Sequence, residues 1–412
     1  MAVSVNSGQV TERTVGYSST PKRVVSEFRG GGRGTMLLAV AFGWFLSIST
    51  RMVYPALLPN LRSAYGLTLT TAGLLLTVLW VAYGLGQLPG GMLADRVGER
   101  LLLSVSSLVS AGMLTLVVVA DSPAVLFAAT ALFGLGTALY GVSRFTVLTD
   151  IYPDRIGTAT GVTMAAGDIG NAVMPPTAGF IAATVAWQFG FGVVIPFFVV
   201  SGVALWVLLP DGGGDSDADG TSVSIAELTS VLRRPIVSHA LVLLVLWGVV
   251  TQAFIGFYPT YLIDIKGFST AAATGLFGLF FALGSLVKPL SGRAYDRVGV
   301  RYPLLVMMSL AAVGLAAIPL SDGFWPFVGV TVLTSSILGY ETVFMSSLTE
   351  KLPAGAQGTG LGTLRTVYIM LGALSPVLFG ALADRGFFDE AFFGIAALSA
   401  LTVAIVLAVV EY

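Results

Sequence analysis

The sequence contains no cysteine and only one histidine, His239. Disulfide bonds and thiolate metal sites are therefore excluded, and so is a metal site built from several histidines. Charged residues are also scarce, at 10% of the chain, whereas a soluble domain carries about 25%. Because so few charges cannot build an ordinary water-exposed surface, lipid must cover most of this protein, and the lipid bilayer is its expected main partner.

Two further absences narrow the function. The chain has no G-x4-G-K-[S/T] motif, so nothing in it predicts ATP hydrolysis, and we expect neither an enzyme nor a bound cofactor. Its formal net charge is -1, without the basic excess typical of proteins that bind nucleic acid. These absences leave membrane functions that need no cofactor and no metal.

What the chain has in abundance is apolar sequence, with 55% hydrophobic residues and a mean hydropathy of +0.88. A helix needs about 20 apolar residues to cross a bilayer. Twelve runs meet that length, which predicts an all-α integral membrane protein of twelve transmembrane helices. They fall near 35–59, 69–93, 101–120, 123–148, 157–184, 188–209, 237–262, 270–291, 301–319, 324–347, 358–382 and 389–410.

Polar segments divide these runs. Residues 1–34 lack the apolar core of a signal peptide, so we expect a disordered cytoplasmic tail. Residues 211–235 open with DGGGDSDADG, a composition typical of a flexible linker. The predicted organisation is a six-helix bundle over 35–210, a cytoplasmic linker, and a second six-helix bundle over 236–412.

The distribution of Lys and Arg predicts the orientation. With the N-terminus inside, the inner segments hold most of the basic residues, and the outer loops hold only Arg62, Lys266 and Arg385. Cytoplasmic loops are the ones enriched in Lys and Arg. We therefore expect a multi-pass protein of the plasma membrane with both termini in the cytoplasm.

The two halves repeat each other. Leu148-Thr149-Asp150 with Pro153 recurs as Leu348-Thr349-Glu350 with Pro353, and a loop pattern recurs 201 positions later. Repeats of this kind place the substrate at their interface, near the bilayer midplane. The repeated loop residues are Gly91, Asp95, Arg96, Gly98 and Arg100, matched by Gly292, Asp296, Arg297, Gly299 and Arg301.

The segment GGMLADRVGER over 90–100 resembles the G-x-L-A-D-R-x-G-x-R loop motif of the major facilitator superfamily (MFS), and SGRAYDRVGVR over 291–301 resembles its second copy. The resemblance covers residues 35–410 and implies alternating access. It also implies that the ten repeated loop residues, with Asp150 and Glu350, form a latch that holds the halves together inside while the outside is open. The simpler interpretation of these charges is positive-inside anchoring.

Six ionisable residues lie within the predicted spans, where each costs at least ~2.5–3.5 kcal/mol to insert. Two positive charges and one negative fall in each half, which leaves a positive excess suited to an anion, and arginine offers a fork for carboxylate or phosphate. We therefore expect the four basic residues to bind substrate and the two acidic ones to carry protons. They are Arg51, Arg144, Lys288 and Arg365, with Asp168 and Glu341.

Two other interpretations of these charges stay open. Arg144–Asp168, and Glu341 with Lys288 or Arg365, are also expected as structural ion pairs between neighbouring helices. The resemblance adds that some organic-anion carriers of the superfamily have an arginine in the first helix, as at Arg51. It adds that a basic residue before proline in helix 8, as at Lys288, resembles monocarboxylate and nitrate carriers, in which arginine is usual.

The remaining polar candidates for the cavity wall are aromatic and amide side chains. We expect Gln252 and Tyr258 to contact substrate. The other candidates for the lining are Tyr83, Tyr140, Asn171 and Tyr368.

The sequence thus favours a monomeric secondary transporter that moves a small organic anion with protons. A second hypothesis is proton-driven export of drugs or other amphipathic compounds. Helix 5 supports it, because Gly161, Gly170, Pro175 and Gly179 resemble the glycine pattern of drug antiporters, although close helix packing explains the same residues. A third is a receptor or scaffold on a transport fold, which a large soluble appendage would favour.

Overall fold

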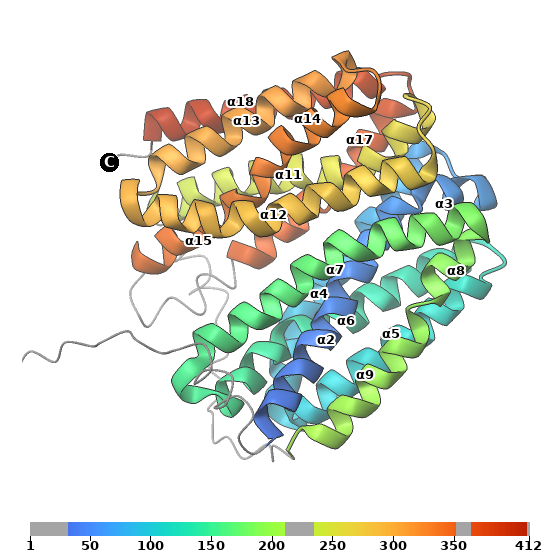
Figure 1. Cartoon of the computed structure of the whole chain (residues 1–412), viewed down its shortest axis with the longest axis vertical. Coiled ribbons are helices and arrows are strands. Elements are labelled where there is room, and N and C mark those ends of the chain that lie inside the picture. Colours follow the sequence, from blue (N-terminus) through green and yellow to red (C-terminus); the bar gives the residue numbers. More distant parts are fainter. Residues whose placement is uncertain (1–31, 211–234, 352–363, 410–412) are drawn as a thin grey trace, which may run out of the picture.

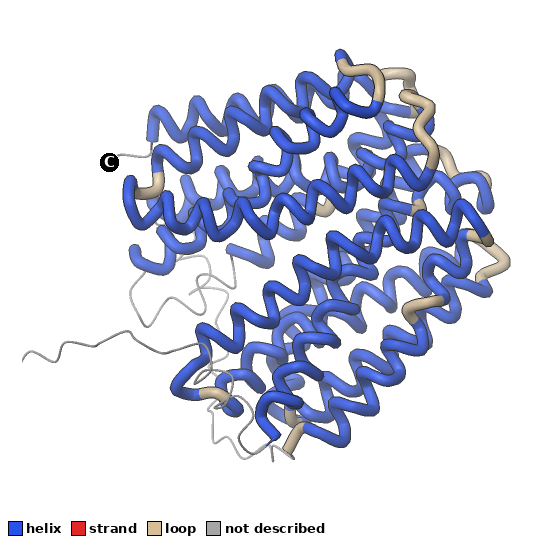
Figure 2. Tube along the Cα trace, viewed as in Figure 1, coloured by secondary structure: helices blue, strands red, loops and turns tan. Residues whose placement is uncertain are grey.

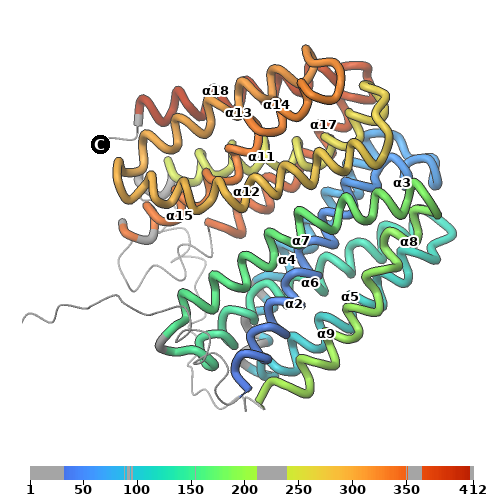
Figure 3. The backbone as a smooth tube through the Cα atoms, viewed as in Figure 1, coloured from blue at the N-terminus to red at the C-terminus, as the bar shows by residue number. Residues whose placement is uncertain are grey.

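The computed structural model describes residues 32–210, 235–351 and 364–409. Every regular element in these ranges is helical, and none of them contains a strand (Figure 2). The predicted tail and linker lie almost wholly outside the described residues. The predicted all-α fold is confirmed, and Figure 3 follows the chain from one group of helices into the other.

In the N-terminal half, a 3-10 turn and eight α-helices make up six spans. The first span continues into the short helix α3, and the sixth is divided into α8 and α9. The bounds are α2 (Arg33–Ala56), α3 (Leu58–Tyr65), α4 (Leu69–Val97), α5 (Glu99–Val119), α6 (Pro123–Ile151), η2 (Pro153–Arg155), α7 (Ile156–Thr184), α8 (Trp187–Gly192) and α9 (Ile195–Leu208).

The C-terminal half repeats this plan, with its tenth span interrupted by a 3-10 turn and its eleventh made of 364–372 followed by α17. The bounds are α11 (Pro235–Asp264), α12 (Thr270–Val298), α13 (Arg301–Leu320), α14 (Phe324–Ser335), η3 (Ser336–Gly339), α15 (Tyr340–Lys351), α17 (Ser375–Ala383) and α18 (Phe388–Val409).

Eleven of these spans are long and apolar enough to cross a membrane. The twelfth is α7, which has 29 residues and so reaches a length of about 43 Å at the ~1.5 Å rise of a helix. It combines glycine, threonine and two consecutive prolines, Pro175 and Pro176, with Asp168 and Asn171, which lowers its apolar content. Its 29 residues are long enough to cross a hydrocarbon core of ~30 Å, and the repeated six-helix plan makes α7 the fifth span of its half.

Several helix pairs join the two halves. α12 packs along α7, α17 packs along α4, α11 contacts both α2 and α3, and α12 also contacts α2. Figure 1 shows the halves meeting at the right-hand end of the view and diverging toward the left. We call the end at which the halves meet the closed end, and the end at which they diverge the open end.

Glycines permit the close approach at the closed end. A Cβ on Gly73 would collide with the backbone carbonyl of Pro376, and a Cβ on Gly380 with that of Leu69. A Cβ on Gly278 would lie 2.6 Å from the carbonyl oxygen of Ala172. Small residues bring helix backbones together where lipid supplies no hydrophobic driving force.

The surface that faces away from this interface is apolar. Leu38, Val207 and Leu320 are exposed, as are Phe180 and Trp325. Single exposed apolar residues are ordinary in soluble proteins, but a surface made of many is typical of contact with lipid. The surface therefore agrees with the membrane environment that the composition predicts.

Candidate functional site

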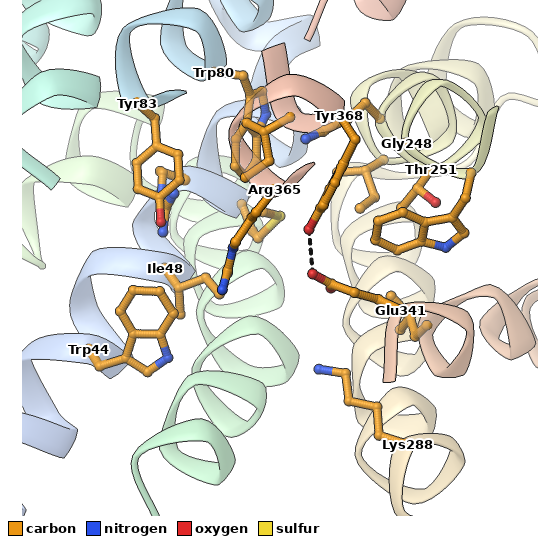
Figure 4. A pocket seen from close by; sticks show the side chains of 17 residues that line it. Trp44, Ile48, Trp80, Tyr83, Gly248, Thr251, Lys288, Glu341, Arg365 and Tyr368 are labelled. Carbon is orange, nitrogen blue, oxygen red and sulfur yellow. Dashed lines mark hydrogen bonds between the residues drawn. The ribbon is translucent and has the colours of Figure 1, made fainter. Parts of the chain in front are cut away.

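A cavity of about 170 Å³ lies between the two halves. Its wall is formed by α2 and α4 of the first half, and by α11, α12, η3, α15 and residues 364–372 of the second. Figure 4 shows the Arg365, Glu341 and Lys288 side chains directed into it. Its lining residues are Trp44, Ile48, Arg51, Met52, Trp80, Tyr83, Trp247, Gly248, Thr251, Gln252, Ile255, Lys288, Leu338, Glu341, Arg365, Tyr368 and Ile369.

Four of the six predicted intramembrane charges line this cavity: Arg51, Lys288, Glu341 and Arg365. The wall therefore carries three basic groups and one acidic group. The two remaining residues lie next to residues of the wall: Asp168 beside Lys288, and Arg144 beside Trp44. The predicted positive excess is thus concentrated at the interface between the halves.

Arg51 is held against aromatic rings. Its side chain is 1% exposed, and its Nε donates a hydrogen bond of 3.2 Å to the Ser47 carbonyl one turn earlier. Its guanidinium carbon lies 3.7 Å from the centroid of the Tyr83 ring and 5.2 Å from that of Trp80. These contacts stabilise a positive charge through the negative faces of the rings without neutralising it.

Arg144 lies behind the cavity wall. Its guanidinium carbon is 3.4 Å from the centroid of Trp44 and 4.1 Å from that of Phe145. Its Nη1 donates a hydrogen bond to the Gly141 carbonyl, whereas its Nε and Nη2 have no hydrogen-bond partner among the described residues. The side chain is 1% exposed, so this charge is buried between two rings.

The second half presents a linked group of three polar residues. The Tyr368 hydroxyl donates a hydrogen bond to Glu341 Oε1, drawn as a dashed line in Figure 4. Arg365 lies one turn before Tyr368 and interacts electrostatically with Glu341. Glu341 stands in the first turn of α15, directly after the 3-10 turn η3. Arg365 therefore has an acidic neighbour, while the Arg51 contacts described above are with neutral groups.

Asp168 and Lys288 form an ion pair of 2.5 Å that joins α7 of one half to α12 of the other. Their side chains are 18% and 35% exposed, so water still reaches the pair. The expected pairing of Asp168 with Arg144 is wrong, because Lys288 takes that place. The expected pairing of Glu341 with Lys288 is replaced by the contact with Tyr368. The other expected partner of Glu341, Arg365, does lie beside it.

The remaining polar candidates separate into two groups. Tyr83, Gln252 and Tyr368 line the cavity, and among the described residues the Gln252 Oε1 and Thr251 hydroxyl atoms have no hydrogen-bond partner. Tyr258, Tyr140 and Asn171 are buried and stand outside the lining of this cavity. The Tyr258 hydroxyl lies 2.6 Å from that of Thr331, and the Tyr140 hydroxyl donates to the Val40 carbonyl.

The sequence reasoning missed three tryptophans of the wall: Trp44, Trp80 and Trp247. Aromatic residues in a helix bundle are usually core residues, and nothing in the local sequence marks these as different. The signal that could have found Trp44 is its position seven residues, or two helical turns, before Arg51 on the same helix face.

Polar contacts between the halves close one end of the cavity. The Asp384 carboxylate accepts hydrogen bonds of 2.7 Å from the backbone N–H groups of Leu69 and Thr70, and another from the Thr70 hydroxyl. Leu69 begins α4, so Asp384 satisfies backbone donors that a helix start leaves free. Nearby, Arg62 forms an ion pair with Asp264. We call Asp384, Thr70, Arg62 and Asp264 the closed-end gate.

Asp384 lies in the loop after α17, outside the membrane-spanning segments. Partial burial acts to raise its pKa, but the hydrogen bonds from Thr70 and Leu69 together outweigh that effect. The pKa of Asp384 is therefore below its ordinary value. The ionised carboxylate of Asp384 therefore stabilises the closed gate.

The predicted latch residues lie at the open end. Gly91 and Asp95 belong to α4, and their surroundings lie outside the described part of the structure. Gly98 and Gly299 have φ values of 80° and 73°, so the tight turns expected there are present. Asp150, Arg96, Asp296 and Arg297 are exposed, and a Cβ on Gly292 would meet open space.

Three contacts of the latch residues lie within one half. Arg100 lies 4.5 Å from the centroid of Trp206 and shares with Asp150 a second cavity, of about 250 Å³, inside the first half. Arg301 donates a hydrogen bond to the Leu407 carbonyl, and Glu350 accepts one from the Tyr295 hydroxyl. In this conformation these contacts do not join the halves.

Comparison with known proteins agrees with this architecture. The family model described as Major Facilitator Superfamily matches residues 40–376. A 2-nitroimidazole transporter of Escherichia coli is 28% identical over 84% of this chain and 87% of its own, and a nitrite extrusion protein of Bacillus subtilis is 30% identical over 66% and 68%. A solved bacterial homologue of the human lysosomal transporter Spinster shares the fold, with a TM-score of 0.75 at 15% identity over 95% of this chain and 97% of its own.

Proposed function

Because the chain belongs to the Major Facilitator Superfamily and is a membrane transporter rather than an enzyme, we propose that its central cavity carries a small anion across the membrane by alternating access. The observation that carries this proposal is the charge of the cavity wall. Three basic groups face one acidic group there, and a buried charge without a counter-ion is costly. An anionic substrate supplies the missing counter-ion.

Arg51 is the central ligand in this proposal. Lys288 is already paired with Asp168, and Arg365 has Glu341 beside it. Arg51 contacts a carbonyl and aromatic rings, so its charge is the one that an anion gains most from approaching. Thr251 and Gln252 add polar atoms that are free to orient the substrate.

The relatives and the cavity size both favour a small substrate. The nitrite extrusion protein and the 2-nitroimidazole transporter are named for small compounds. Pockets for drug-sized ligands measure roughly 300–1,000 Å³. The cavity here is about 170 Å³, which favours a small anion over the alternative of exporting drugs or other amphipathic compounds.

Proton coupling follows from the two carboxylates. A substrate anion that attracts the Arg365 guanidinium weakens the positive field at Glu341, which then binds a proton more readily. Tyr368 keeps the Glu341 side chain in place during the exchange. Asp168 offers a second proton carrier, whose counter-ion Lys288 belongs to the other half.

We assign the open end to the cytoplasm, with both termini on that side, because the basic loops of the chain lie there. In that orientation the structure is inward-facing. The latch residues then engage only in the opposite state, when the open end closes. A single chain contains the whole cavity, so the monomer is sufficient for transport.

Uptake by proteoliposomes tests the proposal. A panel of small anions is offered with an imposed pH gradient. Charge-assisted hydrogen bonds are worth ~1.5–3 kcal/mol, so Arg51→Ala is expected to lower anion transport roughly 10- to 150-fold. The control Arg293→Ala removes an exposed arginine of α12 outside the cavity wall and is expected to transport normally. Unchanged anion transport by Arg51→Ala would refute the central assignment.

The proton assignment is tested separately. Glu341→Gln and Asp168→Asn keep the size of each side chain and remove its titration. If both variants still accumulate anion in response to the pH gradient, neither carboxylate carries the coupled proton.

A further inference from the structure

One wall of the cavity alternates aromatic rings with guanidinium groups. Arg144 lies 3.4 Å from the centroid of Trp44, and Arg51 lies 3.7 Å from that of Tyr83. Trp44 lines the cavity, whereas Arg144 does not. The Trp44 ring therefore borders the cavity and has the buried Arg144 charge against it, while the Arg51 guanidinium carbon lies 5.8 Å from its centroid.

A positive charge behind the ring changes what the ring can bind. The face of an aromatic ring is negative because of its quadrupole, so a bare ring repels an anion placed over it. The Arg144 guanidinium offsets that negative face from behind. No carboxylate forms an ion pair with Arg144 among the described residues, and its Nε and Nη2 make no hydrogen bond there. Arg144 thus acts on the cavity through Trp44.

Rings on the opposite wall are fixed in orientation. Trp247 Nε1 donates a hydrogen bond of 2.9 Å to the Ile337 carbonyl, and the Tyr368 hydroxyl is bound by Glu341. The Trp247 and Tyr368 rings stand edge to face, with centroids 5.7 Å apart. In Figure 4 the Arg365 side chain extends between Trp44 on one side and Tyr368 on the other. The cavity thus offers rigid flat surfaces with cationic groups between them.

We propose that the cavity selects flat anions, bound at the edge by Arg51 and Arg365 and stacked by its face on Trp44, with Arg144 as a positioning residue behind that ring. A flat carboxylate or nitrate-like anion can both bind the guanidinium groups at its edge and stack on Trp44, whereas a pyramidal or puckered anion can only bind the guanidinium groups. This inference rests on the proposed transport of small anions and specifies their shape.

The test compares two ligands of equal charge and carbon number. Benzoate is flat, and cyclohexanecarboxylate is puckered. Nitrate and chlorate, one flat and one pyramidal, repeat the comparison for a smaller ligand. Binding to the purified full-length protein is measured by calorimetry, and the readout is the ratio of the two affinities. Aromatic stacking predicts a preference for the flat member of roughly 2- to 12-fold.

Substitutions of Trp44 and Arg144 test whether these residues cause the preference for flat anions. Trp44→Leu and Arg144→Gln are each expected to bring the ratio close to one, and Arg144→Lys is expected to restore part of it. The matched control is Trp206→Leu, since Trp206 also has an arginine over its ring, Arg100, but lies outside the cavity wall. Its ratio is expected to equal that of the native protein. A purely structural role for Arg144 would weaken both ligands equally and leave the ratio unchanged.

The outcomes separate this inference from the proposed function. A native ratio near one in both ligand pairs, or a preserved ratio in Trp44→Leu, overturns the selection of flat anions while anion transport stands. If none of the four anions binds, the proposed function itself fails. A preference confined to nitrate over chlorate supports the inference and sets the ligand at the smaller size.

Discussion

The contact between Asp384 and the start of α4 should control how often the closed end opens. Its hydrogen bonds to Leu69 and Thr70 link the two halves, so they are lost when the halves separate there. Replacing a capping carboxylate by alanine costs a helix ~0.5–2 kcal/mol, and its interaction with the helix dipole adds ~0.3–1 kcal/mol. Asp384→Ala should therefore destabilise the closed gate by about 1–3 kcal/mol.

A free-energy change of this size measurably increases the fraction of molecules in which the closed end is open. About 1–3 kcal/mol shifts a two-state equilibrium by roughly 5- to 150-fold. Because the chain has no cysteine, a single Ile255→Cys in the cavity wall gives a unique label site. Labelling by a membrane-impermeant maleimide from the closed-end side should accelerate by that factor in Asp384→Ala.

The control removes a carboxylate from the same end of the protein. Asp322 pairs with Lys266 at 3.1 Å, and both belong to the second half, so this ion pair does not join the halves. Asp322→Ala should therefore leave the labelling rate at the level of the Ile255→Cys parent. Equal rates in Asp384→Ala and its parent, or an equal acceleration in Asp322→Ala, would refute the gate.

The same contact predicts a pH dependence with a definite sign. The pKa of Asp384 is lowered in the closed state, so its stabilisation is fully present above the ordinary carboxyl pKa of about 3.9 and is lost as the pH falls through the lowered value. The distance between spin labels on α3 and at residue 385, across the gate, should stay constant from pH 6 to 8 and widen in acid. Asp384→Asn should abolish the acid response.

Three further predictions concern other contacts between the halves. Gly380→Ala should force the Leu69 carbonyl away and raise labelling of Ile255→Cys from the closed end, whereas Gly275→Ala, whose Cβ meets open space, should not. Lys288→Ala should lower the thermal midpoint by leaving Asp168 without its ion-pair partner, and Asp168→Asn in the same chain should recover much of it; no recovery would mean that the pair is not coupled. Glu341→Gln keeps an acceptor for Tyr368, so binding of the anion should survive while the pH dependence of transport flattens; an unchanged pH profile would move the proton elsewhere.

The positions of the spans could be predicted from the sequence because length and apolarity are local properties. The run 157–184 became α7 (Ile156–Thr184), and 270–291 became the longer helix α12 (Thr270–Val298). The extra turns of α12 include Asp296 and Arg297, whose charges ended the predicted run although the helix continues. Helix ends outside the hydrocarbon core carry no hydropathy signal, so their bounds came only from the structure.

The charged residues of the site could be predicted, but their partners could not. A charge within a span is visible in sequence because its insertion is costly. Which charge it meets depends on how the halves pack. Asp168 was expected to pair within its own half, yet α7 lies along α12 and brings Lys288 to it. The tryptophans of the wall were missed for a related reason. A largely apolar ring has no high insertion cost, so its presence in a span does not mark a site.

The Asp168–Lys288 pair lies between two differently packed stretches of α7 and α12. Toward the closed end, Gly179 meets Thr274 and Gly278 meets Ala172, so the helices touch closely. Toward the open end, Gly161 on α7 and Gly292 on α12 have open space where a Cβ would lie. We expect a rotation about the ion pair to bring the open-end parts of α7 and α12 closer while it separates their closed-end contacts. Water-exposed charges suit such a pivot, since an ion pair tolerates a change of angle that interdigitated side chains do not.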